Sequence, residues 1–144
     1  MRYYADSSFL VSCYLIDANT AQAKAYLEAT RKPLTMTVLQ TLEVRNAFEL
    51  GIFRGLLTTS QAAAAWKNLQ RDLRSDRLVR ASAKWPSIFR LAARLAERHS
   101  GTHGTRSLDI LHVAAAKTLR ATEFISFDAR QRALAATIGL RVAP

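Results

Sequence analysis

The stretch EFISFDARQRALA, residues 123–135, predicts a strand that ends in a carboxylate just where a helix begins. Its short apolar run is typical of a buried strand, and Asp128 follows that run directly. The N-terminal stretch RYYADSSFL, residues 2–10, has the same order, with an apolar strand that stops at Asp6 before a helix. Two strand-end aspartates at opposite ends of one chain suggest a common explanation.

Short apolar runs alternate with helical patterns along the whole chain. Strands are expected at residues 2–5, 34–37, 78–81, 123–127 and 140–143. Helices are expected at residues 8–16, 18–30, 38–53, 58–76, 84–100, 107–120 and 128–138. This order predicts an α/β fold, a three-layer sandwich with a short, mostly parallel central sheet of about five strands flanked by helices. A length of 144 residues without repeats or linkers favours a single domain over residues 1–144.

The carboxyl ends of parallel strands are the usual place for a ligand in such a fold. Asp6 and Asp128 both lie at carboxyl ends, so both are expected to face one crevice. Each has a simpler alternative, because an aspartate before a helix is also a common N-cap.

Two further acidic residues border the expected buried side of their helices. Glu43 lies in TVLQTLEVRNAFELG, and Asn46 shares its helix face. The apolar stripe expected beside Glu43 consists of Leu39, Leu42, Ala47 and Leu50. Asp109 lies in RSLDILHVAAAKTL, in the first turn of a helix that Ser107 can cap. Asp109 has the alternative role of complementing the helix dipole, and Glu43 that of pairing with Arg45.

Four carboxylates that converge on one crevice repel one another unless a cation neutralises them. Oxygen ligands with few histidines favour Mg²⁺ or Mn²⁺ over Zn²⁺. Such ions polarise a phosphoryl oxygen and activate water near neutral pH. Six other acidic residues stand in charged or loop contexts and are interpreted as solvated: Asp17, Glu28, Asp72, Asp76, Glu97 and Glu123.

The charge of the chain favours a polyanionic partner. Lysine and arginine number 21 against 11 acidic residues, for a net charge of +10, and 16 of the basic residues are arginine. The guanidinium group of arginine can donate two parallel hydrogen bonds to a phosphate or a carboxylate. Nucleic acid or an acidic protein is therefore the expected partner. No apolar run is long enough for a membrane span, the N-terminus does not read as a signal peptide, and the single cysteine, Cys13, is compatible with a reducing compartment.

Four motifs in order give the chain a family resemblance. They are YYADSS at the start, TLEVRNAF in the first third, RSLDILHVAAA late in the chain and FISFDARQRALA near its end, followed by GLRV. With them the chain resembles the PIN-domain ribonucleases, and most of all the VapC toxins of bacterial toxin–antitoxin pairs. The resemblance covers almost the full length.

The resemblance implies roles for particular residues. Asp6, Glu43 and Asp109 would form the acidic core that binds metal, with Asp128 as the fourth acidic residue. The hydroxyls of Ser126 and Ser7 stand where the family has Ser or Thr beside the site, and Asn46 is a supporting residue on the face of Glu43.

The resemblance also implies a cytoplasmic enzyme that cuts RNA with Mg²⁺ or Mn²⁺, a VapB-like antitoxin that blocks its groove, and a homodimer. Arg90, Arg94 and Arg98 recur every fourth residue, and this stripe could hold RNA or the antitoxin, or be a solvated face.

Two other functions are possible on a similar fold. A non-catalytic RNA- or protein-binding domain on the same fold would be expected to lack one of the four acidic residues, and none is missing. A receiver-type phosphorylation switch would need an acidic pair after the first strand and a strand-end lysine, which the sequence does not offer.

The segment at residues 98–107, with His99 and His103, is expected to be a connector, and His112 is expected to be a packed or hydrogen-bonded histidine.

Overall fold

The computed structural model describes residues 2–144 and divides them into two compact units. Unit 1 consists of the described residues up to Asp6 together with Ser82–Pro144, and unit 2 of Ser7–Ala81. Each unit is an α/β arrangement of its own, so we describe them separately.

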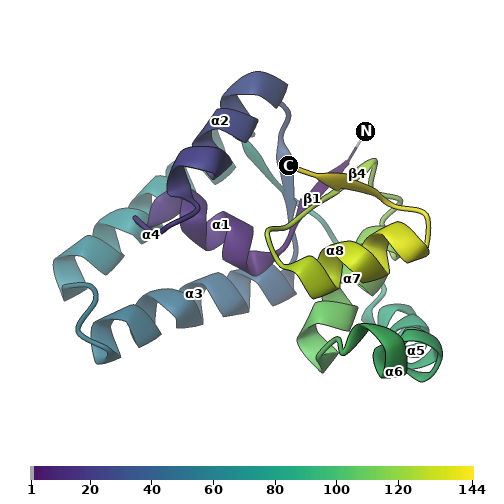
Figure 1. Cartoon of the computed structure of the whole chain (residues 1–144). Coiled ribbons are helices and arrows are strands. Elements are labelled where there is room, and N and C mark those ends of the chain that lie inside the picture. Colours follow the sequence, from purple (N-terminus) through teal and green to yellow (C-terminus); the bar gives the residue numbers. More distant parts are fainter. Residues whose placement is uncertain (1) are drawn as a thin grey trace. The chain divides into compact units, whose positions relative to one another are not determined.

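Unit 1 contains three parallel strands with β4 in the middle (Figure 1). The strands are β1 (Tyr3–Ala5), β4 (Glu123–Ile125) and β5 (Arg141–Ala143). The helices are α5 (Trp85–Leu95), the π-helical segment η1 (Ala96–Ser100), α6 (Gly101–His103), α7 (Ser107–Thr118) and α8 (Ala129–Thr137). Tyr3 stands opposite Glu123, and Glu123 opposite Arg141.

Helix α7 supplies much of the buried surface of unit 1. Its residues 109–116 are all buried, and it packs against both α5 and α8. Ala114, Ala115 and Ala116 are fully inaccessible to solvent, and their small side chains allow the neighbouring elements to approach closely. The alanine run therefore lies in a closely packed part of unit 1.

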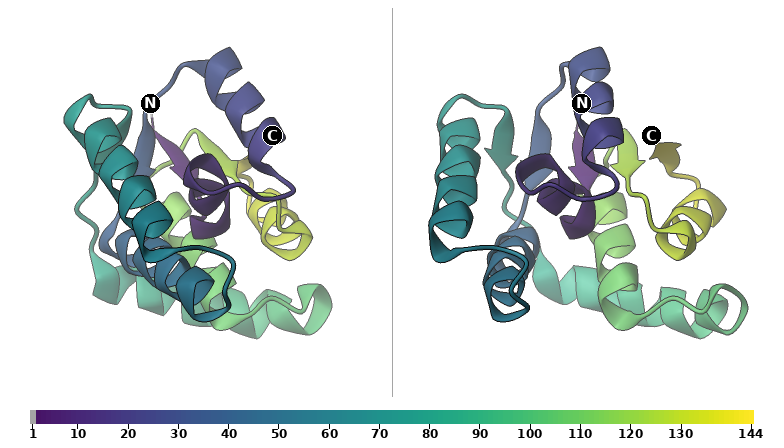
Figure 2. Two further views of the ribbon diagram at one scale, coloured as in Figure 1. Left: turned by 90° about the vertical axis from the view of Figure 1, so that its left-hand side faces the viewer. Right: turned by 60° about the vertical axis from the view of Figure 1, so that its left-hand side comes forward.

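Unit 2 contains two parallel strands, β2 (Leu34–Met36) and β3 (Leu78–Arg80). Its helices are α1 (Ser7–Tyr14), α2 (Thr20–Thr30), α3 (Val38–Phe53) and α4 (Thr59–Arg74). Helix α4 turns back and contacts α3 (Figure 2). Thr58 begins α4 as expected: its hydroxyl accepts from the Gln61 amide, and its own amide donates to Gln61 Oε1.

The five strands found in the described part of the chain are short and pair in parallel within each unit, and helices flank them. The predicted α/β fold is therefore confirmed, and each strand lies within one or two residues of its predicted range. Among residues 2–144, no helix is long and apolar enough to cross a membrane.

The buried face of α3 differs from the predicted one. The residues that α3 buries are Gln40, Val44, Phe48 and Gly51, whereas Leu42 and Leu50 are 67% and 38% exposed. The helix is rotated because Gln40 hydrogen-bonds the backbone at Thr35 and Thr37, which fixes the first turn, and the Phe48 ring packs edge-on against Trp66. The predicted stripe of Leu39, Leu42, Ala47 and Leu50 was wrong.

Two smaller expectations in unit 1 also need correction. Glu123 is buried rather than solvated, because Arg141 stands opposite it in β5 and pairs with it at 2.8 Å. Residues 98–107 do not form a simple connector, because η1 and α6 make much of the segment helical before Gly104 ends it at φ 62°.

Candidate functional site

One hydroxyl joins the two strand-end aspartates of unit 1. Asp6 follows β1, is 1% exposed and donates its backbone N–H to the Ile125 carbonyl at 2.9 Å. Ser126 follows β4, is fully buried, and its Oγ donates to Asp6 Oδ2 at 2.8 Å. The same Oγ accepts from the backbone N–H of Asp128 at 3.0 Å. The parallel pairing of β1 and β4 therefore brings Asp6 and Asp128 to one edge, as predicted.

Asp128 also caps α8, which was its alternative role. Its Oδ1 accepts from the backbone N–H groups of Arg130 at 2.8 Å and Gln131 at 2.9 Å. These are donors at the first turn of a helix, where a carboxylate is favourable both as an acceptor and as a negative charge. Capping uses one oxygen of a half-buried carboxylate, so it fixes the side chain in place at the edge where Asp6 lies.

Asp109 is held in the first turn of α7 by three donors. Its Oδ1 accepts from Gln131 Nε2 at 3.0 Å, and its Oδ2 accepts from the backbone N–H and the Nε of Arg106 at 3.2 and 3.1 Å. The residue is 5% exposed. Arg106, rather than Ser107, occupies the N-cap position of α7, so the expected cap was placed one residue too late.

Gln131 belongs to this candidate site but was not predicted from the sequence. Its backbone N–H binds Asp128 and its side-chain amide binds Asp109, so it connects the two carboxylates. Its Oε1 is buried and has no hydrogen-bond partner. A buried acceptor without a donor is costly. Its position three residues after the cap Asp128 was the available signal.

Unit 2 holds the other predicted acidic residue. Glu43 is half-buried on α3, and its Oε2 accepts from Ser7 Oγ at 2.6 Å. Asn46 is exposed on the same helix. The alternative partner, Arg45, instead lies 3.6 Å from Glu49 and 4.8 Å from the ring centre of Trp66. Glu43 is therefore held by a hydroxyl and not by this arginine.

The side chains of the candidate site have the ligand chemistry of the predicted metal ion. The carboxylates of Asp6, Asp109 and Asp128 offer oxygen ligands only, which fits Mg²⁺ or Mn²⁺. The unpartnered Gln131 Oε1 adds a buried acceptor beside them. As the side chains stand, no three acidic, histidine or cysteine residues within the described range form a group that could hold a metal ion. In unit 1, hydrogen bonds direct these carboxylates toward Ser126, Gln131, Arg106 and backbone amides. The donor chemistry fits, and ion binding would require these side chains to turn.

His112 takes the packed role expected for it. It is 2% exposed, and its Nδ1 lies 3.0 Å from the hydroxyl of Tyr4, which is fully buried. The two rings meet edge to face with centres 5.9 Å apart. This contact joins α7 to β1, so the histidine is part of the buried core of unit 1.

The arginine stripe lies on exposed surface. Arg90 and Arg94 are exposed on α5, and Arg98 is exposed in η1. Arg90 donates to Ser87 Oγ at 2.9 Å. The stripe thus offers positive charge to solvent, which is compatible with each of the roles considered for it.

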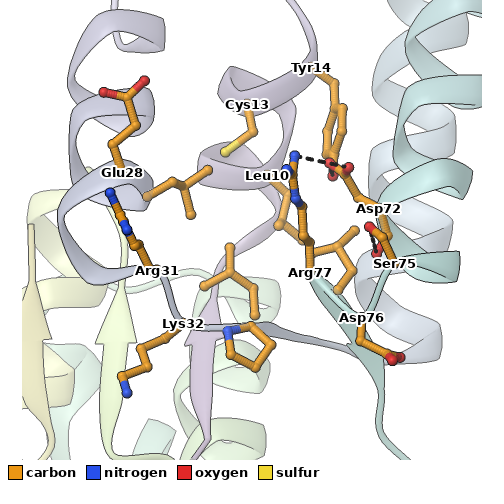
Figure 3. Close-up of a pocket in the computed structure, with 14 residues that line it drawn as sticks. Leu10, Cys13, Tyr14, Glu28, Arg31, Lys32, Asp72, Ser75, Asp76 and Arg77 are labelled. Carbon is orange, nitrogen blue, oxygen red and sulfur yellow. Dashed lines mark hydrogen bonds and ion pairs between the residues drawn. The ribbon is translucent and has the colours of Figure 1, made fainter.

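A separate cavity of about 720 Å³ opens in unit 2 (Figure 3). Leucines line part of it, and Tyr14 donates to Asp72 Oδ2 at 2.9 Å at its side. Asp72 is half-buried, so its prediction as a solvated residue was wrong. Burial raises the pKa of the Cys13 thiol in this cavity to about 12, which keeps it protonated and unreactive. None of the predicted acidic site residues lines the cavity.

An α/β fold with acidic side chains at the carboxyl ends of parallel strands defines a class of proteins whose ligands bind at that edge. Residues 3–136 match the family model of the PIN domain. The chain belongs to the PIN domain family, whose members are generally nucleases.

Two solved structures resemble the chain in fold. PAE2754 from Pyrobaculum aerophilum has a TM-score of 0.64 at 17% identity, over 99% of this chain and 83% of that one. FitAcB from Neisseria gonorrhoeae has a TM-score of 0.64 at 15% identity, over 99% of this chain and 96% of that one. No match was found among curated proteins. At these identities the likeness concerns the fold.

Proposed function

We propose that this chain is a metal-dependent endoribonuclease that cleaves RNA phosphodiester bonds, and that it is the toxin of a type II toxin–antitoxin pair. In this proposal the whole chain acts as one PIN-like domain in the cytoplasm. Asp6, Glu43, Asp109 and Asp128 hold Mg²⁺ or Mn²⁺, and Ser7, Ser126 and Asn46 support them.

The observation that carries the proposal is a continuous polar chain in unit 1. Ser126 joins Asp6 to Asp128, and Gln131 joins Asp128 to Asp109. Two of these carboxylates are at least 95% buried. Burying several carboxylates costs free energy that a helix cap alone does not require. An ion site is a physical reason to gather them.

Glu43 is assigned to the proposed acidic core from its sequence motif, and within unit 2 its carboxylate accepts a hydrogen bond from Ser7. Ser7 follows Asp6 directly in the chain, so the residue that holds Glu43 is covalently attached to the first acidic residue. This link supports the assignment of Glu43 to the acidic core.

The residues of the chain have separable tasks in the proposed reaction. The four carboxylates hold the ion, and Ser126 keeps Asp6 oriented while Gln131 orients Asp109. The bound ion supplies positive charge that polarises the phosphate and favours loss of a proton from the attacking water. Exposed arginines bind the RNA backbone, since charge-assisted contacts to phosphate need no particular base.

The partners follow from surface chemistry. A net charge of +10 suits both RNA and an acidic, VapB-like antitoxin. Large apolar side chains are exposed on both units and support a homodimer. They include Val38, Leu42 and Phe53 on α3, which are 67%, 67% and 87% exposed, and Phe89 and Leu108 in unit 1.

The test is cleavage of a mixed RNA pool by purified protein with Mn²⁺ and with excess EDTA. We expect new RNA ends only with Mn²⁺, and sequencing those ends identifies the target. A control variant, Asp76→Asn, changes an exposed carboxylate of unit 2 and should cleave RNA in Mn²⁺ like the wild type. Equal cleavage in EDTA would exclude the metal-dependent mechanism.

The alternative is a non-catalytic RNA- or protein-binding domain on the same fold. The observation that favours it is that the carboxylates of unit 1 already have hydrogen-bond donors in the structure. Under this alternative the protein would bind RNA with the same affinity in Mn²⁺ and EDTA and release no new ends.

A further inference from the structure

Arg106 provides a positive charge at the carboxylate of Asp109. Its Nε donates to Asp109 Oδ2 at 3.1 Å, and its backbone N–H donates to the same oxygen at 3.2 Å. The carboxylate side chain is 7% exposed, whereas the arginine side chain is 74% exposed. A buried anion therefore has a cation that reaches it from the surface.

Asp128 acts on the same guanidinium. The hydrogen bond to Asp109, the charge of Asp109 and, more weakly, the charge of Asp128 raise the pKa of Arg106. The guanidinium of Arg106 is charged at any ordinary pH, as in every arginine, and the charges of both Asp109 and Asp128 act on it. The repulsion between carboxylates that the sequence predicts is relieved here, in part, by a side chain of the protein itself.

A cation that approaches Asp109 Oδ2 has to compete with this guanidinium. The opposite oxygen, Oδ1, is occupied by Gln131. The arginine can leave Asp109 without unfolding of the site, because its side chain is 74% exposed and is free to turn into solvent. Once released, a guanidinium fork is suited to a phosphate.

We propose that Arg106 is a resident counter-cation of the site, which occupies Asp109 in the metal-free protein and turns to an RNA phosphate when a divalent ion takes Asp109 Oδ2. This inference rests on the proposed function and adds a regulatory element to it: metal loading exposes an RNA-binding group. Arg106 competes with the ion for Asp109 in the metal-free protein and binds RNA once the ion has displaced it.

Removing the guanidinium should therefore have opposite effects on the two ligands. Without the competing charge, Arg106→Met should bind Mn²⁺ more tightly, by at least about twofold, since even a fully exposed ion pair contributes a few tenths of a kcal/mol. The same variant should bind RNA more weakly, and mainly when a divalent ion is present. If Arg106 only capped α7, its replacement would not combine tighter Mn²⁺ binding with weaker RNA binding.

The experiment uses calorimetry for Mn²⁺ and fluorescence polarisation for a labelled RNA, the latter in EDTA and in Ca²⁺. The matched control is Arg120→Met, which removes the same charge just beyond the opposite end of α7. Arg106→Lys is a second variant that keeps the charge without the fork, and circular dichroism confirms folding of each protein. Because the Arg106 side chain is exposed, both variants should fold.

The outcomes separate the inference from the proposed function. Tighter Mn²⁺ binding with weaker Ca²⁺-dependent RNA binding in Arg106→Met, and neither in Arg120→Met, supports the counter-cation. If the wild type binds Mn²⁺ and Arg106→Met binds it with equal or lower affinity, the inference fails and the proposed function stands. If the wild type binds no Mn²⁺, both fail.

Discussion

The hydroxyl of Ser126 lies 2.8 Å from Oδ2 of Asp6, a residue 120 positions earlier in the chain. Both residues directly follow paired parallel strands, so the strand register places them side by side. This one contact explains why two distant segments each end an apolar strand in a polar residue. It also makes the geometry of the carboxylate depend on a buried serine.

Ser126→Ala should destabilise the fold. The change removes a hydroxyl donor to a carboxylate that is 1% exposed, and the loss of a hydrogen bond to a buried acceptor costs about 1–3 kcal/mol. Urea unfolding measures the free energy, with Ser75→Ala as a control at an exposed serine of unit 2. Equal stability of the two variants would show that Ser126 does not hold Asp6.

Arg141→Met should also lower stability, because it leaves the carboxylate of Glu123 buried without its ion-pair partner at 2.8 Å. The expected loss is about 1–3 kcal/mol. Glu123→Gln in the same background should recover part of it, since a neutral amide costs less to bury than a charge. A double-mutant cycle by urea unfolding gives the coupling, and additive effects would contradict the pairing.

Cys13 should resist alkylation in the folded protein. Its pKa is raised from 9.0 to about 12 by burial first and by the charge of Asp17 next, so little thiolate is present at pH 9. Iodoacetamide should react at least about tenfold more slowly than with urea-unfolded protein, because the thiolate is the nucleophile.

The raised pKa of Cys13 also makes the stability of the fold depend on pH. The folded protein holds the Cys13 proton more strongly than the unfolded chain, so this contribution is present below pH 9 and is lost as the pH rises towards 12. Burial likewise raises the pKa of Tyr14. Stability should fall above pH 9, and fall less in Cys13→Ala; an identical alkaline decline in both proteins would contradict the shift.

The arginine stripe should contribute affinity for RNA. Replacing Arg90, Arg94 and Arg98 together by glutamine should reduce the slope of log affinity against log salt by about two, as expected for three lost contacts to single-stranded RNA. The control replaces Arg54, Lys67 and Arg74, which removes the same charge from unit 2. If both triple variants change the slope equally, the stripe is only part of the general positive charge.

Much of the fold was predictable because its signals are local. Apolar runs bounded by helical patterns located each strand described, and the helix expected from residue 58 does begin there, with Thr58 as its N-cap. The rotation of α3 was not predictable, because it depends on Gln40 binding the backbone at the end of β2 and on Phe48 meeting Trp66. A glutamine in the buried stripe contradicts the apolar pattern from which the face was predicted.

The proximity of several candidate site residues was also predictable, whereas their role stays a prediction. Asp6, Asp109, Asp128 and Ser126 lie in one connected polar chain in unit 1, as their positions at strand and helix ends suggested. Gln131 and Arg106 were missed because each acts through a contact made in three dimensions. The carboxylates were expected to need a cation, and sequence alone does not show that an arginine three residues before Asp109 already reaches it.

Asp109 offers the cleanest test of the central proposal. Asn retains an oxygen that can accept from Gln131, so Asp109→Asn removes the charge of this side chain while its bond to α8 can remain. The decisive measurement is the rate of RNA cleavage by folded Asp109→Asn in Mn²⁺, relative to the wild type and to Asp76→Asn. A ligand of a catalytic ion contributes several kcal/mol to the reaction, so we predict a loss of at least about 100-fold for Asp109→Asn and none for Asp76→Asn. A folded Asp109→Asn protein that cuts RNA at the wild-type rate would contradict the proposed acidic metal site and return Asp109 to the role of a helix-dipole partner.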